Sequence, residues 1–167
     1  MDKALPTSVN VLRLAEHGSV IEGELPISKM KRLTPLLLSD EGHVLINLEF
    51  GTGDESRPYV KGLIQCELVL ECQRCLETMK YCVHDEVALT PVLSVNQTDG
   101  IPEGFEPLLV TRDAQSLSEI VEDELLLRLP VVAKHENECL SLKRVEVEMT
   151  EKSHPFEKVL SELKKNH

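Results

Sequence analysis

The chain lacks tryptophan, and its 167 residues include only two tyrosines and three phenylalanines. Its hydrophobic core must therefore be built from leucine, valine and isoleucine. Single-stranded nucleic acids usually stack on exposed aromatic rings, so this scarcity disfavours that mode of binding. A chain of this length can bury about 70% of its unfolded surface, which predicts one domain over residues 1–167.

Positive charge is also scarce, because 18 lysines and arginines stand against 29 aspartates and glutamates, for a net charge of −11. Residues 85–138 alone carry twelve acidic and three basic side chains. Tight binding of RNA phosphates needs clustered lysine and arginine. An acidic surface of this kind repels RNA and attracts basic proteins.

Long hydrophobic runs are missing as well. No apolar stretch approaches the roughly 18 residues of a membrane span, and the first residues lack the apolar core of a signal peptide. We therefore expect a cytoplasmic protein with no membrane partner. Its five cysteines should be reduced thiols or metal ligands and not a disulfide framework.

Recognisable catalytic motifs are absent from the sequence. The six histidines are scattered, and there is no nucleophile elbow, no H-E-x-x-H motif and no glycine-rich phosphate loop. The sequence therefore predicts a protein that is not an enzyme.

What the sequence does contain is a strong alternating pattern of apolar and polar residues. The alternation runs through 43–50, 60–70 and 79–89, which predicts strands that are wet on one side and mostly antiparallel. A further short strand is expected at 108–110, after a polar, flexible loop at 94–107. The predicted fold is α+β, with a mainly antiparallel sheet curled into a partial barrel and flanked by a few helices.

The predicted helices are fewer and shorter. Ser116 and Glu119 form a capping box at the start of a helix that Pro130 ends. Ser8 can cap a helix that ends near Gly18, and Ser28 can cap a second one over residues 29–32. Residues 150–167 include apolar positions at helical spacing, which predicts a C-terminal amphipathic helix.

A C-x-x-C pair, Cys72 and Cys75, lies at the tip of the hairpin predicted between residues 60 and 89. This spacing lets two thiolates reach one zinc ion from a tight turn, and a structural site needs two more ligands. His135 and Cys139, four residues apart, are the natural second pair. Cys82 is disfavoured as a ligand, because the alternation of the strand places it on the face opposite Tyr81 and Val83. We therefore predict a zinc site, with reduced structural cysteines as the alternative.

The same pair admits a second function, that of a zinc- or thiol-dependent redox protein. In catalytic C-x-x-C motifs a helix N-terminus lowers the pKa of the first cysteine. Here strands flank the motif, and we expect Glu71 to raise the pKa of Cys72, with Arg74 acting in the opposite direction. This argues against oxidoreductase activity.

Five parts of the sequence follow one another in a specific order and spacing: 70–75, 102–107, 120–132, Cys139 and Pro155-Phe156. Together they resemble the YceD family, the large ribosomal RNA subunit accumulation proteins of bacteria and plastids. The resemblance covers the chain from about Gly42 onward and is weak over residues 1–40. Some relatives carry further cysteines after the segment that corresponds to 120–132, which implies a zinc site.

The resemblance implies a non-enzymatic factor in the synthesis, processing or stability of 23S ribosomal RNA, which supports large-subunit assembly. The implied partner is ribosomal RNA or a large-subunit assembly intermediate. From the acidic charge of residues 85–138 we expect this contact to be made through a basic ribosomal protein. A protein-binding adaptor with no RNA role stays open. The expected partner-facing acids are Glu119, Glu122, Asp123 and Glu124. The expected RNA contacts are Lys29, Lys31, Arg32, Lys143 and Arg144.

Overall fold

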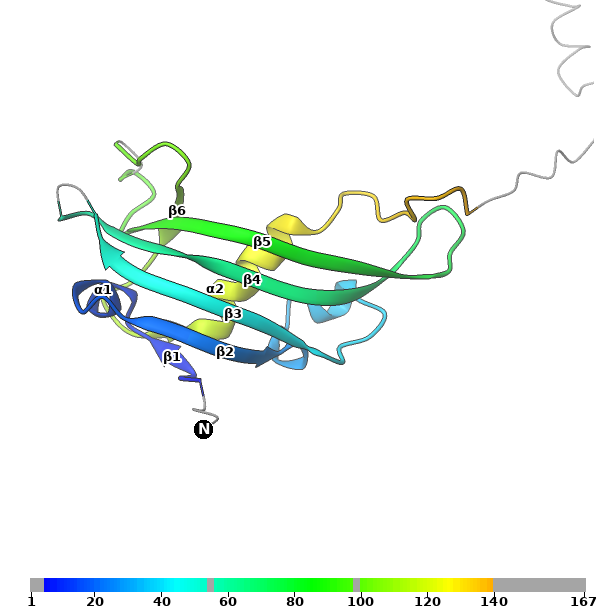
Figure 1. Ribbon diagram of the computed structural model, residues 1–167, viewed down its shortest axis with the longest axis horizontal. Coiled ribbons are helices and arrows are strands. Elements are labelled where there is room, and N and C mark those ends of the chain that lie inside the picture. Colours follow the sequence, from blue (N-terminus) through cyan, green and yellow to red (C-terminus); the bar gives the residue numbers. More distant parts are fainter. Residues whose placement is uncertain (1–4, 54–55, 98–99, 140–167) are drawn as a thin grey trace, which may run out of the picture.

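A computed structural model describes residues 5–53, 56–97 and 100–139. Over these residues a five-stranded sheet carries a helix across one of its faces (Figure 1). The first four strands pair antiparallel, and the last one pairs parallel to its neighbour. The fold is therefore α+β with a mainly antiparallel sheet, as predicted. In order across the sheet, the strands are β2 (Val20–Pro26), β3 (His43–Thr52), β4 (Pro58–Glu71), β5 (Thr78–Val92) and β6 (Glu106–Leu109).

The three central strands confirm the alternating pattern. Most of their inward positions are buried, while most of the residues between them face solvent or are half-buried. β4 and β5 form a long hairpin whose pairing extends from Val60 opposite Leu89 to Glu71 opposite Thr78. The turn at its end contains the C-x-x-C pair. An aliphatic core lies between this sheet and the helix that covers it.

That helix, α2 (Leu117–Arg128), begins where the capping box predicts. The hydroxyl oxygen of Ser116 accepts a hydrogen bond from the Glu119 N–H at 3.4 Å. Leu117, Val121 and Leu125 are buried against the sheet, and α2 lies behind the strands in Figure 1.

The N-terminal helix is shorter than predicted and has a different cap. Ser8 and Val9 form β1 (Ser8–Val9), which pairs with β7 (Gln115–Ser116). The side chain of Asn10 then caps α1 (Val11–Glu16) by accepting the Arg13 N–H at 3.0 Å. Strand pairing at Ser8 therefore displaces the helix start by two residues.

The predicted helix over 29–32 is also wrong. Residues 27–36 instead contain two 3-10 turns, η1 (Ile27–Lys29) and η2 (Thr34–Leu36), and Ser28 does not cap either of them. Met30 and Leu33 are fully buried. The segment is thus held by burial of these apolar side chains, which does not require a regular helix.

The edges of the sheet agree with one expectation and correct another. In the part of the chain that the structure describes, β2 and β6 are the outer strands and do not pair, so the sheet is not a closed barrel and is at most the partial barrel that the sequence predicts. β6 begins at Glu106, inside the predicted 94–107 loop, because Glu106 and Pro107 pair with Leu89 and Thr90 of β5. Proline is tolerated there because β6 is an edge strand.

The predicted C-terminal helix over 150–167 lies outside the described residues. None of the helices in the described ranges combines the length and apolar character that crossing a membrane requires.

Candidate metal centre

The turn between β4 and β5 is fixed by its own backbone. The Cys72 N–H donates to the carbonyl of Glu77 at 2.9 Å, and the Leu76 N–H donates to the carbonyl of Cys72 at 2.8 Å. Leu76 adopts a φ of 62°, which lets the chain reverse within a few residues. This tight turn brings Cys72 and Cys75 to the same side of the hairpin end.

The segment that follows α2 returns to this turn. The Gln73 N–H donates to the carbonyl of Ala133 at 2.8 Å. Cys72 and Ala133 are buried in the same small apolar cluster, against which Cys139 packs. Residues about 60 positions apart in the chain therefore meet at the end of the hairpin.

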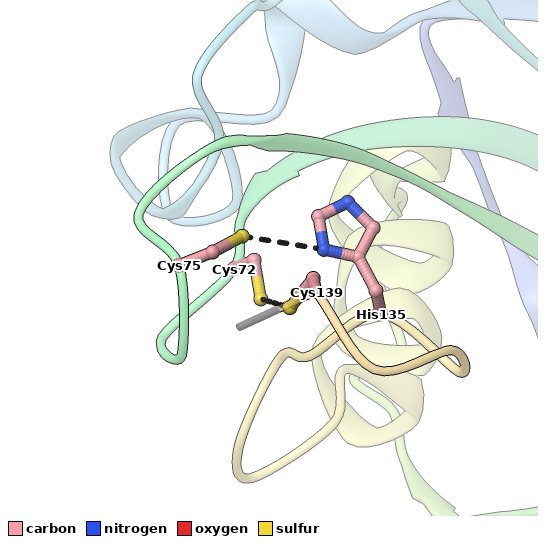
Figure 2. A group of neighbouring side chains, drawn as sticks. All are labelled: Cys72, Cys75, His135 and Cys139. Atoms are coloured by element: carbon pink, nitrogen blue, oxygen red, sulfur yellow. Dashed lines mark hydrogen bonds between the residues drawn. The ribbon is translucent and has the colours of Figure 1, made fainter. Parts of the chain in front are cut away.

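Cys72, Cys75, His135 and Cys139 form one cluster, in which four ligand atoms lie within 4.8 Å of one another (Figure 2). These are the four residues that the sequence predicts as a set. Cys72 is fully buried, and the other three are half-buried. The cluster is a Cys₃His arrangement of the kind that holds a metal ion.

Two distances between donor atoms match those of a tetrahedral zinc ion. With Zn–S bonds of about 2.3 Å and Zn–N bonds of about 2.0 Å, a tetrahedron separates two sulfurs by about 3.8 Å and sulfur from nitrogen by about 3.5 Å. The sulfurs of Cys72 and Cys139 are 3.7 Å apart, and the Cys75 sulfur is 3.5 Å from Nδ1 of His135. With all four ligand atoms within 4.8 Å of one another, the residues present fit zinc.

The electrostatics of Cys72 differ from the sequence expectation. Burial opposes its charged form, but backbone N–H groups of Cys75, Arg74 and His135 outweigh burial and lower the pKa of the thiol. The net shift of the pKa is therefore opposite to the increase expected from Glu71, because backbone donors set the balance at this sulfur. A lowered thiol pKa favours the thiolate that binds metal.

The pKa values of the other two thiols of the cluster, Cys75 and Cys139, are also shifted by their close neighbours. At Cys75 the Glu77 N–H favours the thiolate, but burial and the neighbouring Cys139 and Cys72 outweigh it and raise the pKa. At Cys139 burial is outweighed by Arg74 and His135, and the pKa is lowered. Three neighbouring thiolates repel one another, and a divalent cation bound between them would relieve that repulsion.

The two remaining cysteines lie outside the cluster. Cys82 is exposed on β5, as the strand phase predicts, and Cys66 faces the core of the sheet. Burial, with a smaller effect of Cys82, raises the pKa of Cys66 to about 11. Cys66 therefore behaves as a small apolar residue of the core.

The structure corrects the expected acidic surface on α2. Glu122 and Glu124 are 2% and 5% exposed and are paired within the chain, so neither belongs to a partner-facing surface. The carboxylate of Glu124 pairs with Arg128 at 2.8 Å. A role of Glu119 and Asp123 in partner binding stays a prediction.

The five basic residues predicted to contact RNA have different outcomes in the structure. Arg32 pairs with Glu122 at 3.1 Å and with Asp123 at 2.5 Å, so much of its charge is neutralised within the chain. Lys29 and Lys31 are exposed. Lys143 and Arg144 lie outside the described residues.

Arg74 has contacts that the sequence did not predict. Its Nε donates to the sulfur of Cys139 at 3.0 Å, and its Nη2 donates to the carbonyls of His135, at 3.1 Å, and of Asn137. One feature of the sequence could have identified Arg74 as a site residue. It stands between the two C-x-x-C cysteines, so it must lie beside whatever those cysteines bind.

Fold and site together define a small α+β protein with a Cys₃His cluster at the end of its longest hairpin. Residues 60–165 match the family model described as "Large ribosomal RNA subunit accumulation protein YceD". A curated relative of that name from Haemophilus influenzae is 30% identical over 168 residues, which cover 96% of each chain. No solved structure matches the chain. The chain belongs to the YceD family.

Proposed function

We propose that this protein is a non-enzymatic factor in the synthesis, processing or stability of 23S ribosomal RNA, and that it supports assembly of the large ribosomal subunit in the cytoplasm. The observation that carries the proposal is membership of the YceD family, whose members are described as large ribosomal RNA subunit accumulation proteins. The test is the level of 23S relative to 16S ribosomal RNA in cells with and without the protein.

The proposed contact with the assembling subunit is through a basic ribosomal protein. Support comes from the face of the sheet opposite α2, where alternation and register place six exposed acids and only two lysines. Such a surface attracts basic proteins and repels RNA phosphates. The acids are Glu22, Glu24, Glu49, Glu67, Glu71 and Glu86, and the lysines are Lys61 and Lys80.

Charge reversal separates this surface from the overall charge of the protein. A triple lysine variant on the acidic face should recover less basic ribosomal protein in a pull-down than a control triple variant with the same net charge. The face variant changes Glu22, Glu24 and Glu86. The control changes the exposed acids Glu16, Glu41 and Glu103, which lie outside this face. Equal recovery by the two variants would exclude the acidic face as the docking surface.

The adaptor alternative makes a different prediction for RNA. If RNA contributes to the complex, RNase treatment of the lysate should remove part of the recovered partner set. An unchanged partner set would favour a protein-binding adaptor with no RNA role.

We further propose that the Cys₃His cluster holds one structural zinc ion. When bound, the ion supplies a covalent-like tie between the hairpin end and the segment after α2, without any catalytic role. The convergence of four donor atoms within 4.8 Å, with two donor distances that match a tetrahedral zinc ion, supports this proposal. Metal analysis of untagged protein should give about one zinc per chain, and a value far below one would contradict it.

A redox role for Cys72 and Cys75 is the less favoured alternative. A catalytic thiol must reach its substrate disulfide, and Cys72 is fully buried. The turn after Cys72 leads into β5, so the motif does not open a helix. An insulin reduction assay distinguishes the two functions, and we expect no activity.

A further inference from the structure

Arg74 crosses the gap between the two halves of the Cys₃His cluster. It belongs to the hairpin turn, between Cys72 and Cys75, yet each of its described side-chain hydrogen bonds goes to the segment 135–139. One bond reaches the Cys139 sulfur, and two reach backbone carbonyls, so the guanidinium holds a ligand and the loop that carries it at the same time.

The geometry of these bonds suits arginine and no other residue. A planar guanidinium presents several N–H donors in a fixed arrangement, whereas an ammonium is a single compact charge. Arg74 uses Nε toward the sulfur and Nη2 toward the carbonyls of His135 and Asn137. A lysine at this position has one nitrogen for three acceptors that are spread over five residues.

Charge points to the same role. Three thiolates and a neutral imidazole leave one excess negative charge around a divalent cation, and a neighbouring guanidinium compensates it. Bringing together residues that are about 60 positions apart also costs loop-closure entropy, which a contact formed within the protein itself can offset before any metal binds.

We propose that Arg74 is a positioning residue of the metal centre, which holds residues 135–139 against the hairpin turn so that the four ligands converge. The part of this inference that concerns metal binding rests on the zinc site proposed above. The other part concerns the metal-free chain and can be tested without zinc.

The first test is zinc affinity, measured by competition with a chromophoric chelator. Arg74→Met should weaken binding by about 10- to 100-fold, as loss of an outer-shell partner typically does. Arg74→Lys should lie between Arg74→Met and wild type, because it restores charge but not the fork of donors. The matched control is Lys80→Met, which removes a nearby cation whose described ion pair is with Glu67 and not with a member of the cluster. An Arg74→Met affinity within twofold of wild type would overturn the proposal.

The second test uses protein freed of metal with a chelator. Lys134 is exposed and lies next to the segment that Arg74 holds. Trypsin cleavage after Lys134, followed by mass spectrometry, should be at least about tenfold faster in Arg74→Met than in Lys80→Met, because local opening controls proteolysis. Equal rates would refute the positioning role. If wild type binds no zinc, the zinc proposal fails, while the cleavage rates still decide the role of Arg74.

Discussion

Oε1 of Glu122, on α2, accepts a hydrogen bond from the backbone N–H of Leu33, 89 residues earlier in the chain, at 3.0 Å. The same oxygen accepts the Arg32 N–H at 2.6 Å, and Oε2 accepts from the Arg32 guanidinium. The Glu122 side chain is only 3% exposed. This carboxylate therefore fastens the irregular segment between η1 and η2 to the helix that covers the sheet.

Neutralising Glu122 should destabilise the protein strongly. Glu122→Gln removes the charge that Arg32 and two backbone N–H groups share, and it places an amide N–H₂ where only donors surround it. We expect a loss of about 3 kcal/mol in the free energy of unfolding, which urea denaturation measures.

Glu124→Gln is the matched control, since Glu124 is equally buried and lies on the same helix. Burial raises the pKa of Glu124 despite its pairing with Arg128, so its charge is costly where it stands. The control should lose less than about 1 kcal/mol. Equal losses in the two variants would contradict the special role assigned to Glu122.

Acid should remove the contribution of Glu122. Burial disfavours its charged form, but the N–H groups of Leu33 and Arg32 and the Arg32 guanidinium outweigh burial and lower the pKa of Glu122. A lowered folded-state pKa gives stability that is fully present above the unfolded value of about 4.3 and is lost as the pH falls through the folded value. The stability gap between wild type and Glu122→Gln should therefore shrink below about pH 4.3. A gap that stays constant down to pH 3 would show that the charge is not the cause.

Gly62 on β4 should not tolerate a side chain. A Cβ at this position would lie 2.0 Å from the backbone oxygen of Asn47 on β3, and a backbone atom cannot move aside cheaply. Gly62→Ala should lower the free energy of unfolding by about 2 kcal/mol, as overpacking does. Gly53→Ala is the control, because its Cβ would make ordinary contacts of 3.8 Å or longer. Similar melting temperatures for the two variants would count against the close approach of β3 and β4.

Loss of the metal should loosen the hairpin end. Treatment with a chelator, or Cys72→Ser, should lower the melting temperature by about 5–10 °C, because a ligand that binds only the folded state stabilises it. Cys82→Ser should leave both the zinc content and the melting temperature unchanged, since Cys82 is exposed and outside the cluster. A melting temperature that does not respond to the chelator would show that the cluster stabilises the fold without metal.

The strands and α2 could be predicted because their signals are local. Period-two alternation and the Ser116 cap depend on neighbours within a few residues, and the structure confirms them. The segment 27–36 could not, because it is fixed by burial of Met30 and Leu33 and by hydrogen bonds to Glu122. For the same reason, Glu122 and Glu124, which the sequence predicted as partner-facing acids, proved to be paired within the chain.

The candidate site shows the same division. The spacing of Cys72 and Cys75, and of His135 and Cys139, indicated the ligand set before any geometry was known. The bonds of Arg74 depend on how the 133–139 segment folds back onto the turn, and so does the contribution of His135 to the lowered pKa of Cys72. Contacts between segments about 60 residues apart leave no local pattern in a single sequence.

Quantifying ribosomal RNA across a sucrose gradient tests the central proposal most directly. Cells that lack this protein should show a selective fall in 23S ribosomal RNA and in free large subunits, with 16S ribosomal RNA spared, and the wild-type chain should restore both. An unchanged ratio of 23S to 16S ribosomal RNA and an unchanged subunit profile under several growth conditions would contradict the proposed function.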